Sequence, residues 1–186
     1  ELTEEYCRWT QFDVDNREMR NDTIEHLEFP YPYRNGQRDM AGTVYLSIKG
    51  KRNLFVQAPT GIGKTMAAIF PAVKAMGDGY GEKLFYLTAK TIARGVAVDG
   101  LEVLRKNGLH FRSVLITAKE KICPLEEVNC EPEHCPYAKG HYDRINEAVY
   151  DCITHEMNIT REVLLEYANG HMVCPFEMGL DVSLFV

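Results

Sequence analysis

Short apolar runs alternate with stretches of helical period in the middle of the chain. The apolar runs have strand length and lie at Asn53–Gln57, Lys83–Thr88 and Ser113–Thr117. Helical periodicity fills the gaps between them, at Thr65–Met76 and Ile92–Lys106. Strands that alternate with helices predict an α/β fold with a parallel sheet covered on both faces.

The flanking regions have helical periods of their own. The first dozen residues have helical spacing, and the polar run Asp13–Thr23 that follows predicts a loop or a short second helix. A further helix is expected from about Gln37 to Gly50, and two more at about 141–156 and 160–168. Residues 119–140 are rich in Cys, Pro, Glu and Lys and have no clear period, so the alternation ends there.

A glycine-bearing loop joins the first predicted strand to the helix after it, with the sequence QAPTGIGKT from Gln57 to Thr65. Glycines at positions 61 and 63 allow consecutive backbone N–H groups to point at phosphate oxygens, and the positive end of the following helix faces the same anion. We expect Lys64 to reach the β- and γ-phosphates of ATP and Thr65 to ligate Mg²⁺, as catalytic groups. The expected nucleotide contacts are Gln37, Thr60, Gly61, Ile62, Gly63, Lys64 and Thr65.

Gln37 enters that set because it follows an aromatic, proline-rich stretch ahead of the loop. A side-chain amide carries a donor and an acceptor on one fork, so it can pair with an adenine edge. The alternative is an ordinary surface glutamine on a helix.

Composition limits the function classes. The chain of 186 residues is 45% apolar and carries a net charge of −6, so it is a globular protein and not a basic nucleic-acid binder overall. The sequence contains neither a membrane-spanning apolar stretch nor a secretion signal. We therefore expect a cytoplasmic protein.

Five of the six cysteines lie beyond residue 120, and four of these are candidate metal ligands: Cys123, Cys130, Cys135 and Cys174. The gaps between them are six, four and thirty-eight residues, and prolines follow three of the four directly. Four thiolates can hold zinc or a 4Fe–4S cluster, and the lack of a tight Cys-x-x-Cys pair disfavours zinc without excluding it.

The other cysteines and the nearby histidines have simpler interpretations. Cys7 and Cys152 are expected to be buried and unpaired. Surface or capping positions are expected for His134, His141 and His171, because four cysteines already complete a metal site.

Four motifs occur in the order of a known family: FPYPYRNGQ, QAPTGIGKT, YLTAKT and the four-cysteine insertion. Over residues 29–186 the chain resembles the XPD/DinG family of superfamily 2 DNA helicases. This resemblance implies ATP hydrolysis coupled to 5′-to-3′ translocation on single-stranded DNA or DNA junctions, in repair or recombination. It also implies a RecA-like motor domain with an inserted helical domain, in which the four cysteines hold a 4Fe–4S cluster.

The resemblance assigns DNA contacts as well. Thr88 and Lys90, with Arg94, fall where the family's strand-end motif touches the DNA backbone, and Lys119 stands just before the first cluster ligand. Solvated surface positions are the alternative for each basic residue.

The resemblance also predicts a division of the chain. Residues 1–28 would be a helical linker or the tail of an upstream domain, and 29–118 the first part of the RecA-like domain. Residues 119–178 would form the iron–sulfur domain, and 179–186 the return to the motor domain.

The departures from the family are large. Neither an Asp-Glu-Ala-His motif nor a second motor domain is present, and both ends of the sequence suggest a piece of a longer protein. We therefore expect a fragment that does not turn over ATP alone and that associates through apolar strand edges. The competing hypotheses are a nucleotide-binding zinc or redox metalloprotein that is not a helicase, and a non-catalytic DNA-binding cluster module.

Overall fold

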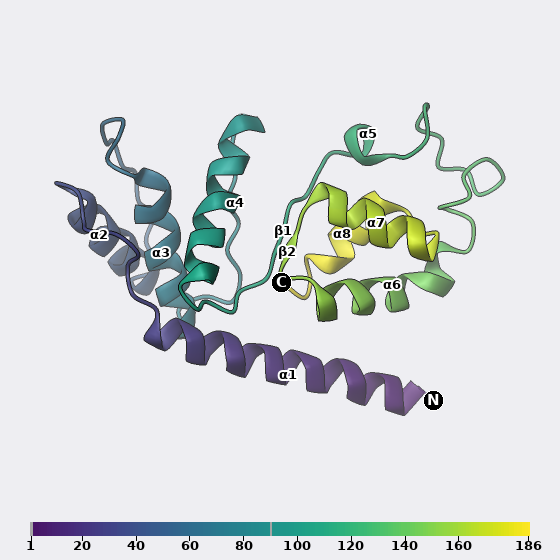
Figure 1. The fold of residues 1–186 in the computed structure, drawn as a ribbon, viewed down its shortest axis with the longest axis horizontal. Helices are drawn as coiled ribbons and strands as arrows, with labels where there is room; N and C mark the ends of the chain where they lie inside the picture. The colour runs from purple at the N-terminus through teal and green to yellow at the C-terminus, as the bar shows by residue number, and fades with distance from the viewer. Residues whose placement is uncertain (1, 90) are drawn as a thin grey trace. The chain divides into compact units, whose positions relative to one another are not determined.

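The chain folds into two compact units of similar size (Figure 1). The computed structural model describes residues 2–89 and 91–186, and the side chains of these except at 91–94. The first, which we name the central unit, is Asp15–His110. The second, the cysteine unit, combines the chain up to Val14 with Phe111–Val186. The four-segment division expected from the sequence stays a prediction.

Three helices lie wholly within the central unit: α2 (Gln37–Lys49), α3 (Lys64–Gly77) and α4 (Thr91–Lys106). Helix α3 packs against both α2 and α4. It is the most apolar of the three, and most of its side chains are buried. All three helices lie close to their predicted bounds, because their apolar stripes and terminal glycines are local signals.

Helix α1 (Leu2–His26) is continuous, so the loop or separate short helix expected at Asp13–Thr23 is wrong. That run is polar but contains no proline or glycine, and polar residues continue a helix when tertiary contacts secure its ends. In the central unit Ile24 is buried, and the Lys74 ammonium donates to the carbonyls of Ile24 and Glu25, at 2.8 and 3.0 Å. Among the described residues, no helix has both the length and the apolar character needed to cross a membrane.

The predicted three-stranded parallel sheet does not form within the described residues. Segments 53–57 and 83–88 are irregular, and Phe55 and Leu87 are 96% and 89% exposed. Only the third predicted strand forms, shortened to β1 (Ser113–Val114), and it pairs in parallel with β2 (Asn158–Ile159). A strand is stable only beside a partner, and the periodicity of one segment cannot supply that partner. The helices around the glycine-bearing loop remain compatible with part of a RecA-like domain.

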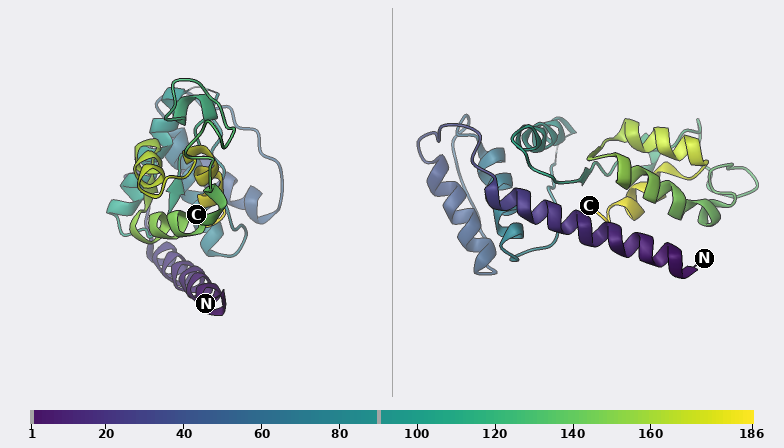
Figure 2. Two further views of the ribbon diagram at one scale, coloured as in Figure 1. Left: turned by 90° about the vertical axis from the view of Figure 1, so that its right-hand side faces the viewer. Right: turned by 60° about the horizontal axis from the view of Figure 1, so that its bottom comes forward.

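The cysteine unit is mainly helical. Short α5 (Lys119–Ile122) precedes a long irregular loop, and α6 (His141–His155), α7 (Arg161–His171) and α8 (Pro175–Val182) follow. These three helices pack together (Figure 2). Their core contains fully buried aliphatic side chains together with Cys152, which is 0% exposed as expected. Burial raises the pKa of the Cys152 thiol to about 12, so it stays protonated at neutral pH.

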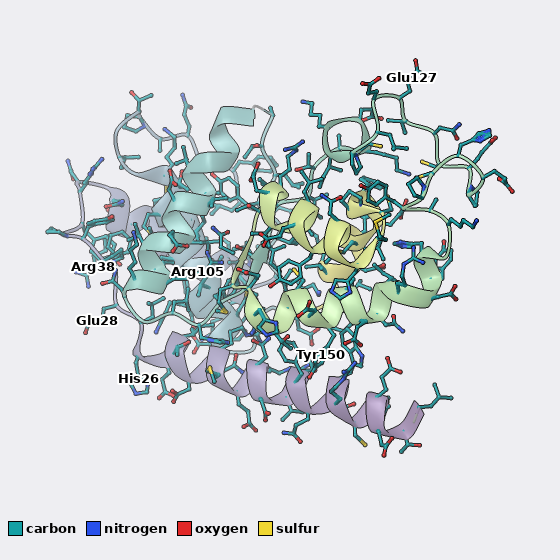
Figure 3. The ribbon with its side chains drawn as sticks, turned by 45° about the vertical axis from the view of Figure 1, so that its right-hand side comes forward. His26, Glu28, Arg38, Arg105, Glu127 and Tyr150 are labelled. Carbon is teal, nitrogen blue, oxygen red and sulfur yellow. The ribbon has the colours of Figure 1, made fainter. Side chains whose placement is uncertain are left out.

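An aromatic cluster fixes the N-terminal part of α1 in the cysteine unit. The Trp9 ring lies 5.1 Å from Tyr150 of α6 and 4.7 Å from Phe185. Arg8 stacks over Tyr150 and pairs with Glu147 at 3.3 Å. Figure 3 shows Tyr150 on the side of α6 that faces α1. Cys7, expected to be buried, is exposed, because α1 turns its other face to this cluster.

The exposed segments 53–57 and 83–88 lead to a prediction about association. Replacing Phe55 and Leu87 together by serine should lower both self-association and binding of an apolar dye, because exposed apolar segments recruit other chains. Light scattering and dye fluorescence would measure this. The Leu2→Ser variant is the control, since Leu2 is 84% exposed but lies on a helix. Unchanged dye binding in the double variant would contradict the expectation.

Candidate nucleotide loop and cysteine region

The loop ahead of α3 has the backbone conformation that phosphate binding requires. Gly61 and Gly63 have φ values of 87° and 82°, in the left-handed region that glycine adopts without strain. Gly63 is the N-cap of α3, no side chain caps it, and the first helical turn contains no acidic residue. The helix therefore presents its positive end to the loop.

Gln37 connects the start of α2 to this loop. Only 4% of its surface is exposed. Its Oε1 accepts the Arg34 backbone N–H at 3.0 Å, and its Nε2 donates to the Gly63 carbonyl at 3.3 Å. The Arg34 guanidinium in turn donates to the Gly61 carbonyl. Both ends of the amide fork are thus used within the protein, and Gln37 is not the surface residue of the alternative interpretation.

Lys64 lies across its own loop. Its ammonium donates to the carbonyls of Ala58 and Pro59, at 3.0 and 2.9 Å. Thr65, the first-turn hydroxyl beside it, is half-buried. Thr60 and Gly61 are exposed and Ile62 is half-buried. All the predicted nucleotide contacts therefore lie on the loop or, like Gln37, are bonded to it.

Aromatic side chains border the segment before Gln37. The Phe29 and Tyr33 rings stack at 4.1 Å, and Phe29 meets Phe70 of α3 edge-on at 5.2 Å. Tyr33 remains 41% exposed. The cluster places an accessible aromatic ring in the same unit as the loop, which the proline-rich pattern alone could not locate.

The predicted DNA-contacting residues of the central unit are only partly described. Thr88 is half-buried at the end of the irregular segment 83–88. Lys90 and the side chain of Arg94 lie outside the described residues. Their contact with DNA stays a prediction.

All four predicted metal-binding cysteines belong to the cysteine unit. Cys123 ends α5, and Cys174 is the N-cap residue of α8, followed by a proline at the first helical position. Cys135 is buried and Cys130 is exposed, both in the irregular loop. Glu127, exposed on the same loop, points away from the helices in Figure 3.

These cysteines are not gathered as ligands in the described part of the chain, where no group of three or more His, Cys, Asp or Glu side chains is placed to hold a metal ion. By donor chemistry, four thiols in one unit fit a tetrahedral metal or a cluster. Burial raises the pKa of the Cys174 thiol, and its backbone hydrogen bonds oppose that rise. A positively charged metal would favour the thiolate instead.

Lys119 lies near two of the cysteines. Its ammonium pairs with Glu177 at 3.1 Å and lies 4.7 Å from the centre of the Phe176 ring. The hydrogen bond to Glu177 raises the Lys119 pKa, and negative charge on the sulfur of Cys130 or Cys174 acts in the same direction. The cation thus already has a carboxylate partner, and its predicted DNA contact stays untested.

The histidines near the cysteines occupy different positions. His134 is exposed, and His171 Nε2 lies 2.9 Å from an Asp151 carboxylate oxygen. Of the surface or capping position expected for His141, the surface alternative is wrong, because the residue is 5% exposed. Its Nδ1 accepts the backbone N–H of Cys174, the N-cap residue of α8, at 3.2 Å. Burial lowers its pKa, so the neutral ring that can accept this bond is favoured. No local sequence signal predicts this contact, since its partners lie 33 residues apart.

The contacts of Gln37 generate a prediction about stability. The Gln37→Ala change removes the acceptor of the Arg34 N–H and the donor to Gly63, so it should lower the free energy of unfolding by roughly 1–3 kcal/mol. Urea unfolding would measure the loss. The control, Gln57→Ala, changes an exposed glutamine and should shift stability by less than about 0.5 kcal/mol. Equal stability of the two variants would contradict a structural role for the Gln37 fork.

Part of the chain, including the glycine-bearing loop, is similar to known helicases. Residues 35–122 match the DEAD/DEAH box helicase family profile, a range that includes Gln37 and the whole loop. A probable ATP-dependent helicase of Methanocaldococcus jannaschii is 51% identical over 47 residues, which is 25% of this chain and 7% of that protein. No solved structure matches.

The chain therefore covers a small part of its curated relative, and the match to the profile covers less than half of the chain. Within these limits, the two similarities support the helicase superfamily, and the profile match includes the glycine-bearing loop.

Proposed function

We propose that this chain is the ATP-binding and cysteine-bearing part of an ATP-dependent DNA helicase. The observation that carries the proposal is the loop Ala58–Gly63 at the N-terminus of α3, with Lys64 and Thr65 behind it and Gln37 bonded to it. Its position inside the segment similar to DEAD/DEAH box helicases supports a helicase among the many classes of nucleotide-binding protein.

Nucleotide binding requires a specific exchange of partners at this loop. The Lys64 ammonium would leave the carbonyls of Ala58 and Pro59 for the β- and γ-phosphates, which are stronger acceptors because they are charged. Thr65 would ligate the Mg²⁺ that accompanies ATP. Gln37 would keep its bonds to the loop or exchange one of them for the adenine edge.

The finer assignments follow from the resemblance to the XPD/DinG family. We propose 5′-to-3′ movement on single-stranded DNA, in repair or recombination, in the cytoplasm. Thr88, Lys90, Arg94 and Lys119 are the proposed DNA contacts. The sequence contains no Asp-Glu-x-His motif, so we propose that this chain binds ATP but does not hydrolyse it alone.

For the cysteine unit we propose a 4Fe–4S cluster held by Cys123, Cys130, Cys135 and Cys174. Such a cluster would cross-link the irregular loop to the start of α8 and make this region rigid. The loop segment between Cys123 and Cys135 contains no helix or strand in the described structure, so it can close around a cluster without breaking regular structure.

The nucleotide proposal predicts that Lys64→Ala weakens binding of a fluorescent ATP analogue about 10- to 100-fold, because one charge-assisted hydrogen bond contributes roughly 1.5–3 kcal/mol. Fluorescence titration with Mg²⁺ present would measure the affinity. Lys49→Ala is the matched control, since Lys49 lies in the last turn of α2 and contacts Tyr80. The nucleotide site would be contradicted if the two variants bound the fluorescent analogue with equal affinity. It would also be contradicted if unlabelled ATP failed to displace the analogue from the wild-type protein.

The cluster proposal predicts about four irons and four acid-labile sulfides per chain after anaerobic purification. The Cys135→Ser variant should lose both, whereas Cys7→Ser, which changes an exposed cysteine of α1, should retain them. Metal analysis and a visible spectrum would measure this. One zinc per chain without labile sulfide would instead support the alternative, a nucleotide-binding zinc protein that is not a helicase.

A further inference from the structure

The first turn of α6 carries two side chains that contact the segments around Cys135 and Cys174. His141 and Arg144 are three residues apart, so they project from neighbouring positions on one face of the helix. Gly140 precedes them with φ 67°, which lets the chain turn sharply out of the cysteine loop into α6. Neither side chain belongs to the proposed cluster ligands.

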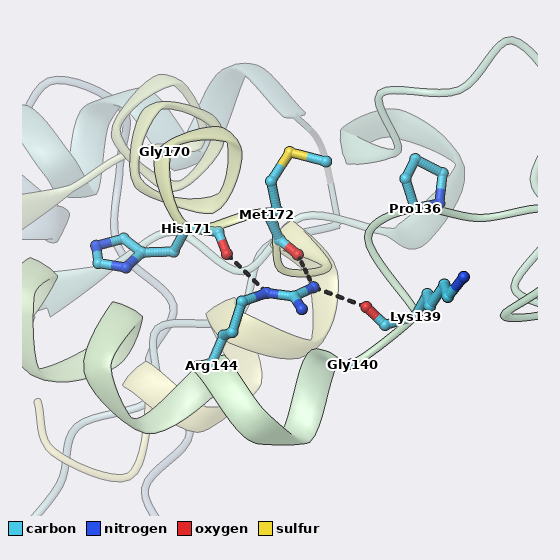
Figure 4. Close-up of a pocket in the computed structure, with 7 residues that line it drawn as sticks. All are labelled: Pro136, Lys139, Gly140, Arg144, Gly170, His171 and Met172. Atoms are coloured by element: carbon cyan, nitrogen blue, oxygen red, sulfur yellow. Dashed lines mark hydrogen bonds between the residues drawn. The ribbon is translucent and has the colours of Figure 1, made fainter.

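Arg144 joins two chain segments that are distant in sequence. Its Nε donates to the His171 carbonyl at 3.0 Å, and its Nη2 donates to the carbonyls of Met172 and Lys139, at 2.6 and 2.7 Å (Figure 4). Two of these acceptors end α7, where helical carbonyls lack donors and a positive charge is favourable. The third belongs to the loop that carries Cys135.

The carbonyls that Arg144 binds lie close in sequence to Cys135 and Cys174. The Cys135 carbonyl accepts the N–H groups of Ala138 and Lys139, at 3.2 and 3.1 Å, so the acceptor Lys139 is in a turn that begins at Cys135. Met172 is two residues before Cys174, and it holds a left-handed conformation with φ 55° that non-glycine residues rarely adopt. The guanidinium stabilises this unusual turn through its carbonyl.

His141 adds a direct contact on the Cys174 side. Its buried ring accepts the Cys174 backbone N–H at 3.2 Å, the donor that precedes α8 and has no partner within that helix. The Cys174 carbonyl meanwhile accepts the Met178 N–H at 2.9 Å inside α8. Both backbone groups of Cys174 are therefore engaged within the protein.

We propose that His141 and Arg144 form a clamp that holds the Cys135 and Cys174 segments in place through their backbone, so that the protein itself positions the segments of two of the four proposed ligands. The proposal rests on the proposed function of the four cysteines as metal ligands. His141 and Arg144 act as positioning residues, through the backbone that carries the thiols.

The segments that carry Cys123 and Cys130 are not held by the clamp. Cys130 is exposed in the irregular loop, and Cys123 follows a helix of four residues. Metal binding would therefore order the segment between Cys123 and Cys130 against a fixed pair. Because only this segment must be ordered, the entropic cost of assembling the site falls.

The clamp also assigns a role to the Arg144 charge. Its guanidinium is engaged by three carbonyl oxygens at hydrogen-bonding distance, within a hollow that Pro136 and Gly170 also line. A nucleic-acid phosphate would have to compete with all three acceptors. Arg144 is therefore a structural cation of the cysteine unit.

Amide exchange in the metal-free chain tests the clamp directly. The chain has six cysteines, so ¹⁵N-cysteine labelling gives a small set of amide signals, which single Cys→Ser variants assign. Arg144→Gln should speed exchange of the Cys174 and Cys135 amides about tenfold, because local opening becomes easier. Cys152, inside α6, should exchange at its wild-type rate and reports on global unfolding.

Variants of His141 separate the hydrogen bond from simple packing. His141→Leu fills the space without an acceptor and should speed exchange at Cys174, whereas His141→Gln keeps an acceptor and should restore most of the protection. Arg8→Gln is the matched control, because Arg8 contacts α6 through Glu147 and Tyr150, with no described bond to the Cys135 or Cys174 segment. An unprotected Cys174 amide in wild type, or equal acceleration at Cys152, would overturn the clamp.

Metal retention provides the second measurement. Chelator should remove iron about tenfold faster from the Arg144→Gln protein than from wild type or Arg8→Gln, and equal rates would overturn the link between the clamp and the metal site. If wild type binds no metal while its Cys174 amide is protected and Arg144-dependent, the metal-site proposal fails and the clamp stands. The two failures are thus distinguishable.

Discussion

Carbonyl oxygens in irregular backbone need hydrogen-bond donors, and long cationic side chains supply many of them in this chain. The loop ahead of α3 receives Lys64 and Arg34, and the turn ahead of α8 receives Arg144. Lys74 serves the end of α1 in the same way, and Arg161 donates to the Lys121 carbonyl at 2.8 Å beside α5. The two functionally interesting regions are both irregular, and both depend on these contacts.

The same contacts reduce the number of basic side chains that are available to nucleic-acid phosphates. The net charge is −6, and several basic side chains are already committed to carbonyl or carboxylate partners. Lys64 differs from Arg144 in this respect, since it is exposed and its two carbonyl partners lie on the loop that a phosphate would occupy. Its exchange of partners is thus part of nucleotide binding, whereas release of Arg144 would dismantle a helix end and a turn.

The two units differ in how complete they are as folds. The cysteine unit has a continuous core of buried aliphatic residues beneath three helices and a small parallel sheet. The central unit has three packed helices, but its two apolar segments, 53–57 and 83–88, remain irregular and exposed. The similarity to DEAD/DEAH box helicases over residues 35–122 extends across both units, from Gln37 to the end of α5.

The sequence by itself determined five of the helices, α2, α3, α4, α6 and α7, and the glycine-bearing loop. Helix bounds follow from apolar period and terminal glycines, and the loop follows from Gly61, Gly63 and Lys64, all of which act over a few residues. The sequence also located Cys152 in a helical core.

Only the tertiary structure decided the rest, because the deciding partners are distant along the chain. It made α1 continuous, paired β1 with β2 instead of the predicted strands, and buried Gln37 against the loop. It also turned His141 toward Cys174 and Arg144 toward both cysteine-bearing segments. Strand pairing and side-chain contacts to a remote backbone depend on which segments meet in space, and periodicity within a short window contains no such information.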